Sequence, residues 1–169
     1  MAKSKKKKPG EVAKATGPTD QTRHISENRK ASFKFEILEQ IECGIVLLGS
    51  EVKSLRENRI SLDEAYVRVR DGELWLVGAD IAEYRQATIW NHAPRRPRKL
   101  LVHKRQLGKI SVRAHEKGLT LIPLRMYFNN RGIIKLMVGV CRGKKLQDKR
   151  QSLKTADAKR SMDRATRRK

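Results

Sequence analysis

Apolar and polar side chains alternate along residues 31–48, the first ordered pattern in the chain. Phe33, Phe35 and Ile37 fall on one face and charged residues separate them on the other, which is the period-2 pattern of a half-buried strand. Gly44 lies inside the run and predicts a bulge or a sharp bend. The segment therefore predicts one long bent strand, as expected where a small sheet curls into a barrel.

The alternation stops at "GSEVKSLREN", which predicts a short helix over residues 51–57. Ser50 suits the N-cap position, and Glu51 stands in the first turn, where the helix dipole favours an acidic side chain. Val52 and Leu55 then share one face of the helix.

Asp71 and Gly72 separate two runs rich in β-forming residues, "EAYVRVR" and "ELWLV". An Asp-Gly pair between such runs predicts a β-hairpin, and a strand-like stretch follows near residues 79–84. Two further strands are predicted over residues 119–130 and 132–141.

A longer helix is predicted over residues 97–118, because apolar side chains recur there at helical spacing: Leu100, Leu107, Ile110 and Ala114. The elements sum to about six antiparallel strands with one long and one short helix. Short strands joined by hairpins indicate a mainly β fold, a closed or nearly closed barrel. A barrel of the oligonucleotide-binding (OB) type and an SH3-like barrel both fit, and the periodicity does not choose between them.

The 169-residue chain carries a formal net charge of +22, and the positive charge is densest at its two ends. Residues 1–30 carry nine basic and three acidic groups, and residues 143–169 carry eleven and three. All eight aromatic residues lie between these ends, in 31–142. The partition predicts a disordered basic arm over residues 1–24, one domain over residues 25–142, and a basic tail that cannot build a core.

Such an excess of cations opposes compaction unless a polyanion neutralises it, and nucleic acid is the favoured partner. An anionic membrane surface is the alternative, but neither arm has the bulky apolar face of an interfacial helix. No apolar run exceeds four residues. We therefore expect no membrane span and no signal-peptide core, and a cytoplasmic protein.

Candidate catalytic and metal-binding groups are few. Cys43 and Cys141 are too far apart in the sequence for a disulfide framework or a CxxC metal site, and we expect reduced thiols in core strands. The four histidines show no metal-ligand spacing. The chain also has no glycine-rich phosphate loop and no G-x-S-x-G motif. We expect a binding protein with no metal, no cofactor and no catalytic residue.

Asn28, Arg29 and Lys30 stand directly before the first predicted strand. They are either a charged linker or a contact to phosphates and base edges at the mouth of the barrel. The residues alone leave both interpretations open.

Glu51, Lys53 and Arg56 lie on the predicted short helix. A carboxylate repels phosphate, so Glu51 suits an acceptor of hydrogen bonds from an exposed RNA base, or a group that orients a neighbouring cation. The alternative for Glu51 is a helix cap or an ion pair with Lys53 or Arg56.

A series of motifs gives the chain a family resemblance: "NRKA", "GSEVKSLR", "DGELWL", "NHAPRRPRKLL", "LTLIPLRMYF", "GKK" and "DKR". In their order and spacing they resemble the small protein B family, the SsrA-binding (tmRNA-binding) proteins of bacterial trans-translation. The resemblance runs from about residue 25 to the C-terminus. It implies an OB barrel with two to three accessory helices, and it decides between the two barrels.

The resemblance also implies partners. The ligand would be the tRNA-like domain of tmRNA (SsrA RNA), delivered to a 70S ribosome stalled without a stop codon by a monomeric, non-enzymatic adaptor. RNA-binding roles would fall on the following residues: Asn28, Arg29, Lys30, Glu51, Lys53, Arg56, Asn91, His92, Arg95 and Arg98.

The tail has its own implied role. Disordered when free, it would become helical in the empty mRNA channel beside the decoding centre of 16S rRNA. The residues carried over are Asp148, Lys149, Arg150, Leu153, Lys154 and Met162. Thr155 and Ala156 stand where the family has cations, and Thr166 stands where a larger apolar residue is frequent.

Two other functions are alternatives. A structural ribosomal protein also pairs a small barrel with basic extensions. A single-stranded DNA-binding barrel would stack bases on exposed aromatic side chains. We expect Phe33, Phe35 and Trp75 in the core instead.

Overall fold

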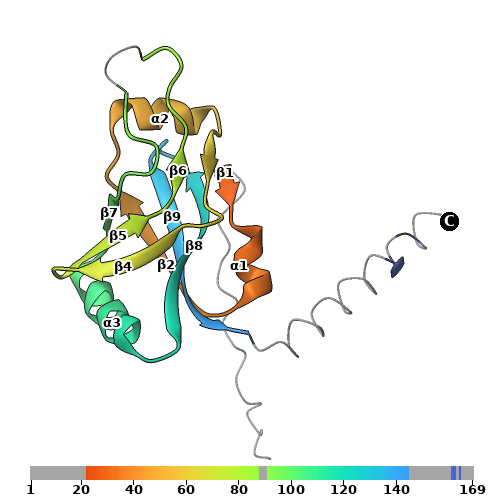
Figure 1. Cartoon of the computed structure of the whole chain (residues 1–169), viewed down its shortest axis with the longest axis vertical. Coiled ribbons are helices and arrows are strands. Elements are labelled where there is room, and N and C mark those ends of the chain that lie inside the picture. Colours follow the sequence, from red (N-terminus) through yellow and green to blue (C-terminus); the bar gives the residue numbers. More distant parts are fainter. Residues whose placement is uncertain (1–21, 88–90, 145–160, 163, 165–169) are drawn as a thin grey trace, which may run out of the picture.

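The computed structural model describes residues 22–87, 91–144, 161–162 and 164 of the chain. Six antiparallel strands close into a ring at its centre (Figure 1). They are β2 (Phe35–Ile45), β4 (Tyr66–Arg70), β5 (Glu73–Val77), β7 (Arg98–Leu101), β8 (Leu119–Phe128) and β9 (Ile134–Gly143). Around the ring the order is β8, β4, β5, β7, β2 and β9, and β9 pairs back with β8. The predicted fold class, a mainly β antiparallel barrel, is confirmed.

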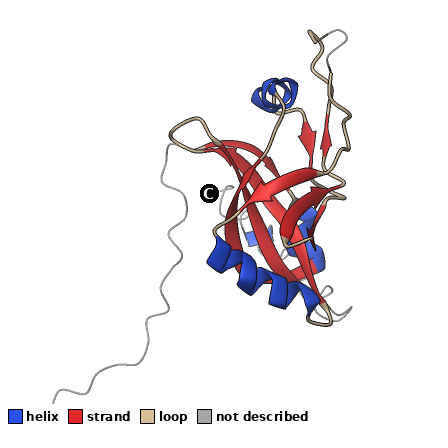
Figure 2. Ribbon diagram, turned by 90° about the vertical axis from the view of Figure 1, so that its left-hand side faces the viewer, coloured by secondary structure: helices blue, strands red, loops and turns tan. Residues whose placement is uncertain are grey.

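Within the described residues, three further strands and three helices attach to the ring. The strand β1 (Arg23–Glu27) pairs with one end of β8, while β3 (Ile60–Ser61) and β6 (Asp80–Ile81) form a separate small sheet. The helices are α1 (Arg29–Lys34), α2 (Gly49–Arg56) and α3 (Lys104–His115). Helices α2 and α3 lie at opposite ends of the barrel (Figure 1, Figure 2).

Alternate side chains of each strand fill the interior of the ring. In β5, Leu74 and Leu76 point inwards and are at most 1% exposed, whereas Trp75 between them faces outwards. In β9, Leu136 and Val138 continue the same core. Because the core lies inside the ring, the outer strand faces are available for contacts.

The predicted hairpin is confirmed at the Asp71–Gly72 turn. Both turn residues have positive φ angles, 52° for Asp71 and 69° for Gly72, as a tight two-residue hairpin turn requires. The flanking strands β4 and β5 pair along their whole length, which places Arg68 opposite Trp75.

Residues 29–34 form α1 and not the beginning of the predicted long strand. The Asn28 side chain caps this helix, because its Oδ1 accepts a 3.0 Å hydrogen bond from the N–H of Ala31. Ala31 packs with Ile122 and Leu124 in a second apolar cluster, on the outer face of the sheet. The cap and this packing together outweigh the alternating pattern.

Two further strand predictions need correction. The irregularity of β2 lies between Ile37 and Glu39 and not at Gly44. Gly44 instead allows close strand approach, since a Cβ atom there would lie 3.3 Å from Cβ of Leu101. The strand expected near residues 79–84 is only the two-residue β6.

The helix predicted over residues 97–118 is wrong in its first part. Residues 98–101 form β7, which pairs with both β2 and β5. Its Leu100 is buried inside the barrel, and the helix α3 begins only at Lys104. Ile110 of α3 is 1% exposed, so the apolar face of the helix does cover the barrel as its spacing indicates.

The aromatic side chains expected in the core are not buried. Phe33 is 40% exposed on α1, and Phe35 and Trp75 are partly exposed. The two thiols do follow expectation, because Cys43 in β2 and Cys141 in β9 are free and fully buried.

The two basic extensions fall mostly outside the described residues. The strand β1 begins at Arg23, inside the segment expected to be an arm. Met162 is helical and 69% exposed. No helix of the described ranges is long and apolar enough to cross a membrane. The other tail residues singled out from the sequence lie outside the described residues: Asp148, Lys149, Arg150, Leu153 and Lys154.

Candidate nucleic-acid interface

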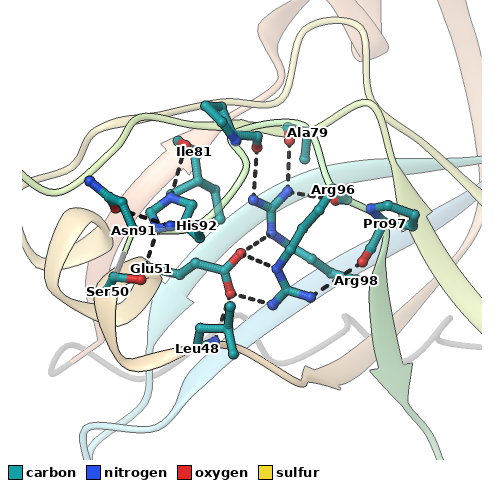
Figure 3. Close-up of polar contacts among 11 residues, drawn as sticks. Leu48, Ser50, Glu51, Ala79, Ile81, Asn91, His92, Arg96, Pro97 and Arg98 are labelled. Atoms are coloured by element: carbon teal, nitrogen blue, oxygen red, sulfur yellow. Dashed lines mark hydrogen bonds and ion pairs between the residues drawn. The ribbon is translucent and has the colours of Figure 1, made fainter. Parts of the chain in front are cut away.

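Helix α2 covers one end of the barrel, and the carboxylate of Glu51 points inwards (Figure 3). Oε2 of Glu51 accepts a 2.7 Å hydrogen bond from the N–H of Leu48, the residue at the N-cap. The predicted short helix is therefore confirmed, but Glu51 supplies the cap in place of Ser50.

Two arginines share this one buried carboxylate. Oε1 of Glu51 accepts from Nε of Arg98 at 2.8 Å and from Nε of Arg96 at 2.7 Å. Nη2 of Arg96 donates to the other carboxylate oxygen. The remaining donors of Arg98 reach backbone carbonyls, those of Ala79 and Pro94, each at 2.8 Å. The network ties α2 to β7 and to the chain around β6.

The charge state of Glu51 follows from these contacts. Burial alone would raise the pKa of its carboxyl group. The hydrogen bonds from Arg96 and Leu48 and the charge of Arg98 outweigh burial and lower that pKa. Glu51 is therefore held as a carboxylate inside the protein.

His92 and Asn91 fix the loop that approaches α2. His92 Nε2 lies 3.1 Å from the carbonyl oxygen of Ile81, and Nδ1 lies 3.0 Å from Oγ of Ser50. A carbonyl only accepts, so Nε2 carries the proton and Nδ1 accepts from the Ser50 hydroxyl. The Asn91 amide bonds the backbone of Tyr84 in both directions, at 3.2 and 3.0 Å.

Asn28, at the N-cap of α1, also fixes neighbouring segments through hydrogen bonds. Besides capping the helix, its Nδ2 donates to the carbonyl of Leu62 at 3.0 Å, and its backbone N–H donates to Leu124 at 2.7 Å. The side chain is 5% exposed. Asn28 therefore joins the start of α1 to β8 and to the segment that follows β3.

Nine of the ten predicted binding residues fall into a buried group and an exposed group, and the half-buried Asn91 belongs to neither. Asn28, Glu51, His92 and Arg98 are buried, and their polar atoms are bonded within the protein. Glu51 takes the capping and ion-pair role that the sequence left open, with arginines of the loop and β7 as partners. These four side chains lie beneath the candidate RNA-binding surface and support it, and they are not themselves exposed on it.

The exposed group consists of cations. Lys53 projects from α2 with Nζ 5.3 Å from the centre of the Tyr84 ring. Arg95 is held by Asp80 through a 3.1 Å contact. The full exposed group is Arg29, Lys30, Lys53, Arg56 and Arg95.

Arg96 was not among the site residues predicted from the sequence. It lies two positions before Arg98 and reaches the same carboxylate. Residues two apart in an extended segment point to the same side. This spacing is the sequence signal from which a shared partner of Arg96 and Arg98 could have been predicted. Within the described residues, no group of three or more His, Cys, Asp or Glu side chains is arranged to hold a metal ion.

A small antiparallel barrel with a cationic surface around α2 is the architecture of a nucleic-acid-binding protein. The chain belongs to the SmpB protein family, since the sequence model of that family matches residues 25–168. The resemblance noted in the sequence is therefore confirmed.

Individual relatives agree. The SsrA-binding protein of Rhodopirellula baltica is 59% identical over 145 residues, covering 86% of this chain and 82% of the relative. The SsrA-binding protein of Cereibacter sphaeroides (strain ATCC 17029 / ATH 2.4.9) is 48% identical over 153 residues, covering 90% and 96%.

A solved structure is also similar, with a TM-score of 0.62 and 47% sequence identity. The match covers 72% of this chain and 85% of the other. That structure is described as "tmRNA-SmpB: a journey to the center of the bacterial ribosome".

Proposed function

We propose that this chain binds tmRNA and acts with it in trans-translation on the ribosome. The observation that carries the proposal is the family match, which extends over residues 25–168 and so includes both the barrel and most of the basic tail. The related proteins are named for binding SsrA RNA, and the similar structure is a tmRNA complex of the ribosome.

The surface proposed to hold the tRNA-like domain is the end of the barrel around α2. Lys53 and Arg56 are exposed on this helix, and Arg95 is exposed on the adjoining loop. Arg56 also lines a pocket of about 370 Å³ with Arg23 and Asn130, and no acidic residue of the described ranges lines it. A predominantly cationic surface of this kind suits the phosphates of a folded RNA.

The buried network gives this surface its shape. Glu51 fixes Arg96 and Arg98, and His92 fixes the loop on Ser50. Because these contacts tie residues 92–98 to α2 at several points, the exposed cations are carried on a rigid support. We assign positioning roles to the buried residues and RNA contacts to the exposed ones, Arg29 and Lys30 of α1 included.

The tail is proposed to enter the empty mRNA channel and to fold there. Residues 143–169 carry eleven basic groups and three acidic ones. Ribosomal RNA phosphates would neutralise that charge, and a helix that cannot persist alone could then form. In this scheme the chain is an RNA-binding adaptor in the cytoplasm and carries out no reaction of its own.

Crosslinking in cells, followed by identification of the bound RNA, tests the proposal. We expect tmRNA to be the most enriched RNA. Recovery of ribosomal RNA alone, at one copy of the protein per ribosome regardless of stalling, would identify a structural ribosomal protein instead.

Truncation after Gln147 tests the division between barrel and tail. The shortened chain should keep its affinity for tmRNA and lose peptide tagging on stalled ribosomes, because the residues proposed to hold the RNA remain. Equal loss of both activities would contradict the division.

A further inference from the structure

The outer face of β4 and β5 presents two aromatic side chains that the fold does not bury. Tyr66 is 43% exposed, and Trp75 is partly exposed on the outside of the barrel. Their inward neighbours Val67 and Leu74 fill the core. Burial in the barrel therefore does not account for the placement of these two rings.

Cations flank Trp75 on both neighbouring strands. Arg68 of β4 and Lys99 of β7 stand directly opposite Trp75 in the two ladders. Side chains directly opposite each other across a sheet have Cβ atoms about 5 Å apart. Trp75 thus lies in the middle of a row with a basic residue on each side.

The two acidic residues of the β4–β5 hairpin, Asp71 and Glu73, are already paired. Glu73 accepts from Lys99, and Asp71 lies 3.3 Å from Arg70. Within the described part of the chain, the exposed guanidinium group of Arg68 has no hydrogen bond or ion pair. Among the charged residues of the hairpin and Lys99, Arg68 is therefore left uncompensated, and it lies beside Trp75.

The two rings are spaced for consecutive bases. Tyr66 stands opposite Val77, and Val77 is the next outward-facing residue after Trp75 on β5. The two rings are therefore diagonal neighbours across the β4–β5 pair. Diagonal neighbours lie about 7–8 Å apart, within reach of aromatic side chains. Aromatic rings on an exposed sheet with cations around them are a common arrangement for stacking unpaired bases.

We infer that Tyr66, Trp75 and Arg68 form a second RNA site, which takes two consecutive unpaired nucleotides. The bases stack on Trp75 and Tyr66, and Arg68, the uncompensated cation beside Trp75, meets a flanking phosphate. The site lies on the side of the barrel, apart from the surface around α2. It extends the proposed RNA-binding function and rests on it for the class of ligand.

Fluorescence of Trp75 tests the site directly. Trp90→Phe leaves Trp75 as the only tryptophan of the full chain. Titration with an adenylate tetranucleotide should quench its emission, because a stacked base quenches indole, whereas a blunt RNA duplex should not. Trp75→Leu in the natural chain should weaken tetranucleotide binding about 5- to 150-fold, as expected for the loss of one stacked base.

Two control variants make the result specific. Val112→Trp combined with Trp75→Phe and Trp90→Phe places a reporter on α3, where Val112 is 68% exposed among cations. This reporter should not be quenched. Arg68→Ala should reduce the slope of log affinity against log salt by about one.

Two outcomes would overturn the inference. One is unchanged Trp75 emission at tetranucleotide concentrations that saturate binding in an anisotropy measurement. The other is equal quenching of the α3 reporter, which indicates general attraction to a polycation. Binding of the tRNA-like domain is measured separately, so failure of this site and failure of the proposed function give different results.

Discussion

Glu51 and Arg98 meet inside the protein, where Oε1 of Glu51 accepts a 2.8 Å hydrogen bond from Nε of Arg98. Both side chains are fully buried. The contact joins α2 to β7, two elements from distant parts of the chain. The family resemblance assigned RNA contacts to both residues, and the structure uses them to hold the surface in place.

Replacing Glu51 by Gln should lower the free energy of unfolding by about 3–5 kcal/mol, because removal of one partner leaves buried cationic groups without an anion. Urea unfolding with linear extrapolation measures the change. Glu57→Gln is the matched control. Glu57 is exposed and lies 3.8 Å from Arg59, so its loss should cost no more than about 0.5 kcal/mol. Equal effects of the two substitutions would show that the buried network stabilises the fold no more than an exposed ion pair does.

The contribution of Glu51 should depend on pH. Its pKa is lowered in the folded protein, so its stabilisation is complete above the ordinary glutamate pKa of about 4.3. The stabilisation is lost as pH falls through the lower, folded-state pKa. The difference in unfolding free energy between the natural chain and Glu51→Gln should therefore shrink on acidification. A difference that stays constant down to the acid unfolding of the natural chain would contradict the assignment.

Asn28→Ala should lower the free energy of unfolding by about 1–3 kcal/mol, because the helix cap and the bond to Leu62 are both lost. Asn28→Ser keeps a capping oxygen and loses the second bond, so its effect should be intermediate. Asn130→Ala, in the exposed turn between β8 and β9, is the control and should have little effect. If Asn28→Ser is as damaging as Asn28→Ala, the cap is not what Asn28 contributes.

The two thiols should be unreactive in the folded protein. Burial raises the pKa of Cys43 to about 12 and that of Cys141 to about 11. A disulfide reagent at mildly alkaline pH should modify neither thiol until urea is added, since the thiolate is the reactive form. Modification of the native protein at the rate of a free thiol would show that β2 or β9 opens readily.

Local signals in the sequence predicted local structure well. The Asp71–Gly72 pair placed the hairpin, because a two-residue turn depends on the φ angles of those residues alone. The spacing of Leu107 and Ile110 gave the buried face of α3 for a similar reason. The mainly β barrel class followed from such elements.

Contacts between distant segments could not be predicted in this way. Leu100 continues the helical spacing of α3 but belongs to β7, because pairing with β2 and β5 decides its conformation. The helix α1 interrupts a strand pattern because Ala31 packs against an apolar cluster on β8 and β9. In the candidate site, Arg29, Lys30, Lys53 and Arg56 were singled out by their place beside predicted elements, and Arg95 only by the family resemblance. The partners of Glu51 were not predicted, because they lie 45 and 47 positions away.

The most direct test is the equilibrium affinity of the full chain for the tRNA-like domain of tmRNA over a range of salt concentrations. Lys53→Ala with Arg56→Ala should weaken binding and reduce the salt slope by about two, because each cation displaces about one counterion from the RNA. Lys109→Ala with Lys117→Ala removes two exposed cations at the opposite end of the barrel and should leave the affinity within about two-fold. Equal weakening by both pairs would contradict the claim that the surface around α2 holds the RNA.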